Sequence, residues 1–121
     1  FARSEARRGQ AKALVAQLVG RDRPLILMGD FNCTWDEEDS ALRRIVEKLD
    51  LKVYQPAADE LVTHLATGRR LDWILVSQEL EVVRHEVLAD RVSDHRPVVA
   101  DVRWASSEAP GKRRPSDRSA R

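Results

Sequence analysis

The feature that most limits the fold of this chain is an unbroken apolar run at residues 25–28, Leu-Ile-Leu-Met. Residues 21–24 read as a turn before this run, and polar residues begin abruptly after it, at Gly29. Short continuous apolar runs of this kind are typical of strands that are buried on both faces. We therefore expect a strand here, with other layers of the molecule packed against each of its sides.

Amphipathic helices are expected before and after this strand. The first covers residues 4–20 and stops at Gly20. Its apolar residues recur at helical spacing: Ala11, Leu14, Val15, Leu18 and Val19. The second helix is expected to begin near four acidic residues at positions 36–39. The positive end of a helix dipole favours acidic residues near the start of a helix. Its apolar face consists of Leu42, Ile45, Val46 and Leu49.

Strands dominate the rest of the chain. Four are expected, at residues 51–54, 71–76, 80–88 and 97–104. A long loop is expected at residues 55–68. The order of helix, strand, helix and then mostly strands predicts an α/β (α+β) domain at residues 1–104. Residues 105–121, rich in Ser, Pro, Gly and Arg, are expected to form a basic, disordered tail.

Composition excludes several classes of protein. No stretch of the chain approaches the roughly 20 consecutive apolar residues of a spanning helix, so we expect no membrane span. A single cysteine, Cys33, cannot form an internal disulfide, and one free thiol suits a cytoplasmic location. Residues 1–104 carry a net charge of −2, which argues against a broad nucleic-acid-binding surface. Because the chain begins at Phe1, without an initiator Met, we expect it to be a fragment of a longer protein.

The apolar run leads directly into the first polar motif, Gly29-Asp30-Phe31-Asn32. Residues two apart on an extended backbone share a face, so Asp30 and Asn32 are expected to project together while Phe31 turns into the core. They offer a carboxylate to a hard metal ion or a water, and an amide donor to a phosphoryl oxygen. The alternative is a simple turn, since Gly, Asp and Asn all favour turns.

A second polar position is Asp72, which lies inside the apolar strand expected at residues 71–76. Burying an ionised carboxylate is costly unless it is paired or hydrogen-bonded, so Asp72 needs a specific partner. Either neighbouring arginine, Arg69 or Arg70, would make a purely structural ion pair. The more informative partner is His95, which comes directly before the last strand.

The third motif is Ser93-Asp94-His95-Arg96-Pro97. A carboxylate behind one nitrogen of the His95 ring would fix its tautomer, raise its basicity and leave the other nitrogen free for substrate. Asp94 is a natural ligand for Mg²⁺, which proteins usually hold by one or two carboxylates, waters and substrate oxygens. The alternative is a capped turn in which His95 is solvated. Each motif alone says little, but three in this order, each next to a strand, are hard to explain by coincidence.

Other reactive or aromatic residues are assigned smaller roles. His64 can reach substrate from the long loop, although a solvated loop histidine is the more frequent case. His85 lies among charged residues of a strand and is expected to be exposed. No base is paired with Cys33, which argues against a thiol nucleophile. Trp73 and Trp104 are assigned to the core.

The three motifs resemble, in this order, those of the endonuclease/exonuclease/phosphatase superfamily, which has the deoxyribonuclease I-like fold. The resemblance covers about residues 4–104, and it is nearest to small bacterial hydrolases. It implies the C-terminal half of a four-layer α/β/β/α sandwich, with mostly antiparallel or mixed sheets and flanking helices.

The resemblance also implies roles for individual residues in a metal-dependent hydrolase of phosphate esters. Asp30 would bind and orient the attacking water, and Asn32 would hydrogen-bond the phosphoryl group. His95 would contact the scissile phosphate, as a general base or as a cation, and Asp72 would orient it. Asp94 and Asp30 would contribute to a site for Mg²⁺ or Mn²⁺.

Relatives supply an Asn, a metal-binding Glu and a second His from an earlier half of the domain. We therefore expect the missing N-terminal half to be the main partner of this chain, with no obligate protein partner of another kind evident. Alone, the chain is expected to be inactive and weakly stable or self-associating, because half a sandwich leaves an apolar face uncovered.

In the full-length context we expect a divalent-metal-dependent phosphodiesterase that acts by in-line attack of an activated water. Relatives act on nucleic acids, phospholipids and small phosphodiesters, so the substrate stays open among these. The alternative is a non-catalytic binding or remnant module that keeps the motifs but lacks a complete metal site.

Overall fold

Helices and strands follow one another in the predicted order along residues 2–106, the part of the chain that this computed structural model describes. The elements are α1 (Ala2–Leu18), β1 (Ile26–Asp30), α2 (Ala41–Leu49), β2 (Lys52–Val53), β3 (Asp72–Val76), β4 (Leu80–Val87) and β5 (Val98–Trp104). The predicted α/β (α+β) class is confirmed. Most element ends lie within two residues of the predicted ones, and a long loop separates β2 from β3 as expected.

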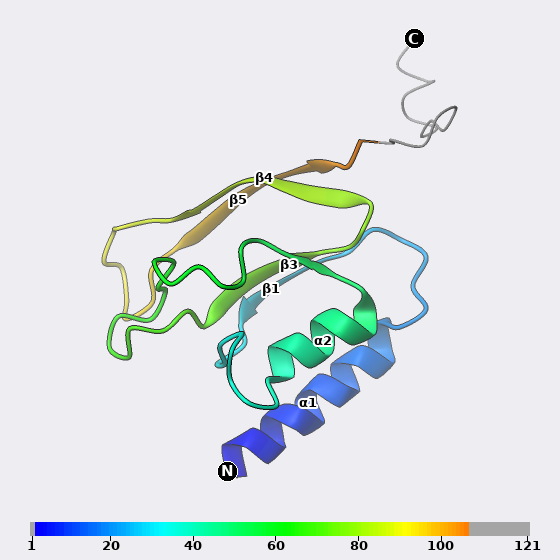
Figure 1. Cartoon of the computed structure of the whole chain (residues 1–121), viewed down its shortest axis with the longest axis horizontal. Coiled ribbons are helices and arrows are strands. Elements are labelled where there is room, and N and C mark those ends of the chain that lie inside the picture. Colours follow the sequence, from blue (N-terminus) through cyan, green and yellow to red (C-terminus); the bar gives the residue numbers. More distant parts are fainter. Residues whose placement is uncertain (1, 107–121) are drawn as a thin grey trace.

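Strand β3 is the centre of the larger sheet. It lies between β1 and β2 and is antiparallel to both. Strands β4 and β5 form a separate antiparallel pair with a register shift between Val82 and Arg84. Figure 1 shows α1 and α2 on one side of β1 and β3, and the β4–β5 hairpin on the other side. The chain is thus built in layers, with the sheet between helices and hairpin.

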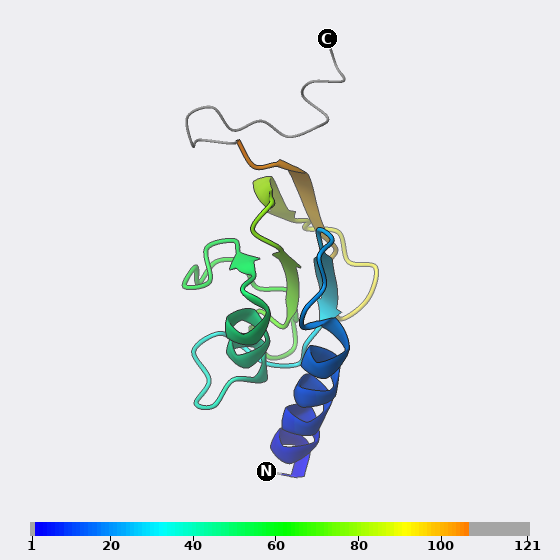
Figure 2. The same ribbon diagram turned by 90° about the vertical axis from the view of Figure 1, so that its right-hand side faces the viewer.

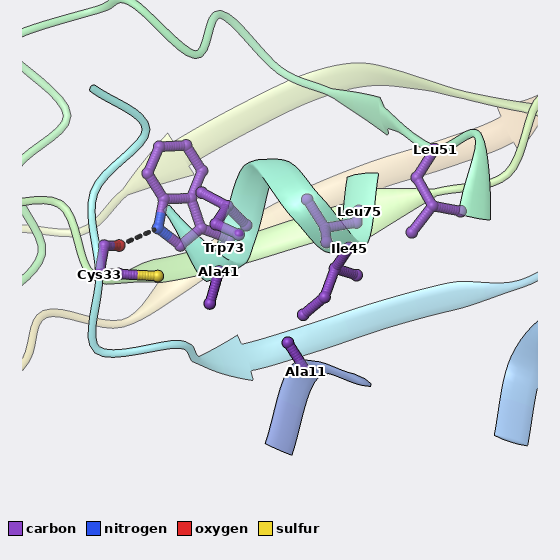
Figure 3. Close-up of a cluster of buried hydrophobic side chains, with 8 residues drawn as sticks. Ala11, Cys33, Ala41, Ile45, Leu51, Trp73 and Leu75 are labelled. Atoms are coloured by element: carbon purple, nitrogen blue, oxygen red, sulfur yellow. Dashed lines mark hydrogen bonds between the residues drawn. The ribbon is translucent and has the colours of Figure 1, made fainter. Parts of the chain in front are cut away.

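The main core fills the space between the helices and the sheet. Trp73 and Leu75 of β3 are fully buried there, against Leu42 and Ile45 of α2. The indole Nε1 of Trp73 donates a hydrogen bond of 3.0 Å to the backbone oxygen of Cys33, as Figure 3 shows. This bond ties the loop that follows β1 to the centre of the sheet.

The opposite face of β3 supports a second, smaller core. Ile74 and Val76 point to this side, because side chains alternate along a strand, and they are buried with Leu80. Val82 of β4 and Val98 of β5 pack against them. The hairpin therefore covers part of the second face of the sheet.

Helix α2 begins at a well-formed N-cap. Ser40 has an extended backbone, and its hydroxyl accepts a hydrogen bond from the backbone N–H of Arg43. The four acidic residues at positions 36–39 lie before this cap, in the loop that leads to it. There Asp39 pairs with Arg8 of α1 and Arg44 of α2, which links the two helices.

The prediction that residues 25–28 are buried on both faces is wrong. Leu25 and Leu27 pack against the main core, but Ile26 is 46% exposed and Met28 is 67% exposed. Strand β1 is an edge strand, and within the described residues the hairpin does not cover its outer face. An apolar surface is therefore left open beside β3.

Two further predictions of burial are corrected. Trp104, assigned to the core, is 47% exposed, because it lies at the end of β5 in a sheet of only two strands. Val19, placed on the apolar face of the first helix, is 58% exposed, because α1 ends one residue earlier, at Leu18.

The C-terminal tail predicted from residue 105 falls almost entirely outside the described residues. No helix within the described part of the chain is long and apolar enough to cross a membrane.

Candidate active site

The centre of the site is a pair formed by Asp72 and His95. Asp72 opens β3, and His95 lies in the loop that leads into β5. The Nδ1 atom of His95 is 2.7 Å from Oδ2 of Asp72, so the contact expected from the sequence is present. This hydrogen bond, with the negative charges of Asp72, Asp30 and Asp94, raises the pKa of His95, and partial burial opposes the rise.

The alternative partners for Asp72 are engaged elsewhere. Arg70 is buried over the ring of Trp73, and it donates hydrogen bonds to the backbone oxygens of Tyr54 and Gln55. Its burial lowers the pKa of Arg70 to about 10. Arg69 instead pairs with Glu37 at 3.0 Å. The structural ion pair considered for Asp72 is therefore wrong.

Asp30 reaches the same histidine from the neighbouring strand. It ends β1 directly opposite Asp72 in the antiparallel register of β1 and β3. Its Oδ2 lies 3.6 Å from Nε2 of His95, on the other side of the ring from the contact with Asp72. Two residues distant in the sequence from His95 are thus brought to it by strand pairing.

Thr63 is a positioning residue that sequence reasoning missed. Its fully buried hydroxyl accepts hydrogen bonds from the backbone N–H groups of Leu71 and Asp72, at 2.9 and 3.1 Å. Its backbone oxygen accepts a hydrogen bond of 2.7 Å from the N–H of Arg96. One threonine therefore holds the segments that carry Asp72 and His95 next to each other. The only sequence signal for Thr63 is its position next to His64.

Asn32 is positioned differently from the expectation of a shared strand face. Strand β1 ends at Asp30, and Asn32 has a left-handed backbone with φ of 53°. The Oδ1 atom of Asp30 accepts a hydrogen bond from the backbone N–H of Asn32 at 2.8 Å, which is the pattern of an Asx turn. The motif therefore makes a turn at the end of the strand, while Phe31 packs against the main core as predicted.

His64 and Asp94 form a second pair beside the first. Nε2 of His64 lies 3.5 Å from Oδ2 of Asp94, and the ring of His64 is tilted against that of His95 with centroids 4.8 Å apart. The side chain of His64 is only 17% exposed. The sequence-based preference for a solvated loop histidine is therefore wrong.

The site residues include two overlapping groups that could hold a cation. Among the described residues, the ligand atoms of Asp30, Asp72 and His95 lie within 4.8 Å of one another, and so do those of His64, Asp94 and His95. The first group offers two carboxylates, the donors that Mg²⁺ prefers, so its chemistry fits a divalent ion. Asp30 and Asp94, the predicted metal ligands, fall in different groups that His95 joins.

A cavity of about 220 Å³ opens next to Asp72 on the side of the sheet away from the helices. Its wall combines Asp72 and Arg96 with apolar side chains of Met28, Ile74 and Val98. The hollow thus borders both the polar site and the uncovered apolar surface of β1. The cavity therefore gives access to the Asp72 carboxylate from this side of the sheet.

Two other reactive side chains lie apart from the site. Burial raises the pKa of the Cys33 thiol, which disfavours the thiolate and agrees with the argument against a thiol nucleophile. The ring of His85 stacks on that of Tyr54 at 4.7 Å, with both nitrogens buried. Burial lowers the pKa of His85, and the expectation that it is exposed is wrong.

Comparison with known proteins agrees with this geometry. A sequence profile described as the Endonuclease/Exonuclease/phosphatase family matches residues 1–95, well over half of the chain. The chain belongs to this family. A crystal structure of an endonuclease/exonuclease/phosphatase from Bacteroides vulgatus superposes with a TM-score of 0.67 at 29% identity, over 84% of this chain. The predicted superfamily and its layered fold are therefore confirmed.

Two curated relatives of this chain are longer than the chain itself. UPF0294 proteins of Yersinia pseudotuberculosis serotype O:1b (strain IP 31758) and of Yersinia pestis are each 32% identical over 85 residues. The match covers 70% of this chain but only 32% of each relative, and the match to the Bacteroides protein covers 45% of that structure. The chain thus spans about a third of the length of these two relatives and about half of the length of the Bacteroides protein.

Proposed function

We propose that this chain supplies catalytic residues to a divalent-metal-dependent phosphodiesterase, which hydrolyses a phosphate ester by in-line attack of water. One observation carries the proposal: His95 lies between two carboxylates, Asp72 at Nδ1 and Asp30 beyond Nε2, and Asp72 itself borders a cavity. A histidine held in this way can move a proton or carry a positive charge close to a bound phosphate. The proposal concerns the complete protein, since this chain spans only part of its relatives.

Each residue has a defined task in this mechanism. Asp72 accepts a hydrogen bond from the Nδ1–H of His95 and so fixes the ring, which leaves Nε2 to contact the scissile phosphate. Asp30, which lies near Nε2 on the side of the ring away from Asp72, orients the attacking water. Asn32, exposed at the turn after β1, donates its amide to a phosphoryl oxygen. The raised pKa of His95 favours the imidazolium, which stabilises negative charge on the phosphoryl group.

The metal site is proposed to include Asp30 and Asp94. Family members generally depend on a divalent ion, and the carboxylates around His95 are suitable ligands for Mg²⁺ or Mn²⁺. When bound, the ion would neutralise charge on the phosphoryl oxygens. Holding that ion is then a task of these two carboxylates, and Asp72 is left to orient His95.

Substrates are proposed from the chemistry of the site, which requires only a phosphate ester. The net charge of −2 on residues 1–104 argues against tight binding of duplex nucleic acid by this part of the protein. Phospholipids, small phosphodiesters and nucleic acids are therefore to be compared directly.

The decisive experiment measures hydrolysis by the complete protein, with Mg²⁺, of bis(p-nitrophenyl) phosphate, DNA and phospholipid. His95→Ala is expected to lower kcat/KM by at least about 100-fold, because a positioned acid or base typically contributes 10²–10⁴-fold. His85→Phe, which keeps an aromatic ring on Tyr54 away from the site, is the matched control. Unchanged hydrolysis in His95→Ala would contradict the mechanism, and no hydrolysis by the unaltered protein would favour a non-catalytic binding module.

A further inference from the structure

A second cluster of ligand atoms lies beside the proposed catalytic pair, formed by His64, Asp94 and His95. It joins two segments that the backbone holds in register. His64 pairs with His95 in an antiparallel bridge, and the N–H of Leu65 donates a hydrogen bond of 3.0 Å to the backbone oxygen of Asp94. Short-range motion of the two loops relative to each other is therefore restricted.

Both histidines of this cluster have one ring nitrogen held and the other turned toward a carboxylate. Nδ1 of His64 lies 2.7 Å from the hydroxyl of Thr67, and Nδ1 of His95 lies 2.7 Å from Asp72. Histidines that bind metal ions almost always have the second nitrogen engaged in this way, which fixes the ring and its tautomer. With Nδ1 donating its proton, Nε2 of His64 presents a lone pair to Asp94, an arrangement that a cation between them stabilises.

The distances fit a shared ion better than a direct hydrogen bond. Nε2 of His64 and Oδ2 of Asp94 are 3.5 Å apart, beyond the usual 2.7–3.2 Å of an N–H···O bond. Two ligands at roughly 2.0–2.1 Å from a tetrahedral zinc ion lie about 3.3 Å from each other. All three ligand atoms lie within 4.8 Å of one another, so small side-chain rotations bring them to one ion. The Asp94 side chain is 70% exposed, which leaves a route from solvent.

We propose that His64 Nε2, His95 Nε2 and one Asp94 carboxylate oxygen form a binding site for a single Zn²⁺ ion. Two imidazoles and one carboxylate suit Zn²⁺, whereas Mg²⁺ prefers oxygen ligands alone. Three protein ligands leave the fourth position to water or to an oxygen of a bound molecule. Nε2 of His95 and the Asp94 carboxylate also serve the proposed hydrolysis, so Zn²⁺ bound here would exclude that reaction and act as an inhibitor. Zn²⁺ binding is measured without hydrolysis, so it can be tested whether or not the proposed function holds.

The experiment is isothermal titration calorimetry of the complete protein with Zn²⁺, in an excess of Mg²⁺. The unaltered protein is expected to bind one Zn²⁺ that His64→Ala and Asp94→Asn each weaken by at least about 100-fold, since loss even of outer-shell partners costs 10–100-fold. His85→Phe is the control, because it removes the remaining histidine of the chain and leaves the cluster intact. Equal Zn²⁺ affinity in His64→Ala and the unaltered protein would overturn the proposal.

X-ray absorption of the zinc-loaded protein gives a second measurement that does not depend on affinity. Two imidazole ligands are expected in the unaltered protein and one in His64→Gln, whose folding is checked by circular dichroism. Zinc binding that Asp30→Asn abolishes and His64→Gln leaves unchanged would place the ion in the other group, with Asp30 and Asp72, and would also overturn the proposal.

Discussion

At the scale of single residues, the charge state of His95 is set by its neighbours. The hydrogen bond from Nδ1 to Asp72 contributes most to its raised pKa, and the charges of Asp30 and Asp94 act in the same direction. Because the folded state holds the proton more tightly than the unfolded state, this pair stabilises the fold while His95 is protonated. The stabilisation is fully present below the unfolded pKa of about 6.5 and is lost as the pH rises through the folded pKa.

Asp72→Asn is expected to lower the pKa of His95, because the neutral amide supports the imidazolium less than a carboxylate does. Titration of the His95 ring by NMR measures this shift directly. In denaturant unfolding, the unaltered protein should exceed the variant in stability by more at about pH 5.5 than at about pH 8.5. A His95 pKa that stays unchanged in Asp72→Asn would contradict the assigned cause.

Thr63→Val is expected to lower the free energy of unfolding by about 1–3 kcal/mol, the usual cost of leaving buried hydrogen-bonding groups unsatisfied. The substitution keeps the side-chain shape but removes the hydroxyl that accepts from the N–H groups of Leu71 and Asp72. Thr63→Ser retains the hydroxyl and should lose less stability. Denaturant unfolding compares the three proteins, and a valine variant as stable as the serine variant would refute the role given to Thr63.

These residues also mark what the sequence could and could not predict about the site. The pairing of Asp72 with His95 was predictable, because a carboxylate in an apolar strand must have a partner. The role of Thr63 was not predictable. A neutral hydroxyl in a loop carries no large desolvation cost, so nothing in the sequence requires it to have a partner. His64 was predicted to be solvated, because most loop histidines are. The β-bridge that places it against His95 depends on tertiary contacts, which the sequence does not reveal.

At the scale of elements, local patterns located the helices and strands but not the surfaces that cover them. Apolar periodicity and stop signals such as Gly20 act within a few residues, so the predicted element boundaries lie close to the observed ones. The burial of β1 depends on segments distant in the sequence. Its apolar run fits a strand with two buried faces, yet Met28 is exposed because the hairpin covers only part of the sheet.

Ser40→Ala is expected to destabilise α2, with a loss of about 1–2 kcal/mol in the free energy of unfolding. Ser40 is buried, caps the helix through the N–H of Arg43, and donates a hydrogen bond of 2.8 Å to the backbone oxygen of Thr34. Ser40→Thr keeps both interactions and is the control. Chemical denaturation measures both variants, and an alanine variant that matches the unaltered protein would show that this cap contributes nothing.

At the scale of the whole molecule, the open apolar surface on β1 is the main departure from a fully covered domain. The helices cover one face of the sheet, and the hairpin lies over part of the other, as Figure 2 shows from the side. Ile26 and Met28 remain exposed, and Met28 also lines the cavity that borders Asp72. Contiguous apolar surface of this kind promotes association in water. The sequence-based expectation that the isolated chain self-associates can therefore be assigned to a particular surface.

Met28→Lys is expected to shift the isolated 121-residue chain toward the monomer in sedimentation velocity. Met28 is 67% exposed, so the substitution removes apolar surface without burying a charge, and the thermal unfolding midpoint should stay nearly constant. Leu27→Lys, one position away, places an ammonium group against the main core and should unfold the chain at a lower temperature, because a buried unpaired charge is costly. Self-association that persists unchanged in Met28→Lys would mean that another surface drives it. A monomeric, sharply unfolding unaltered chain would mean that this exposed strand face does not promote association at all.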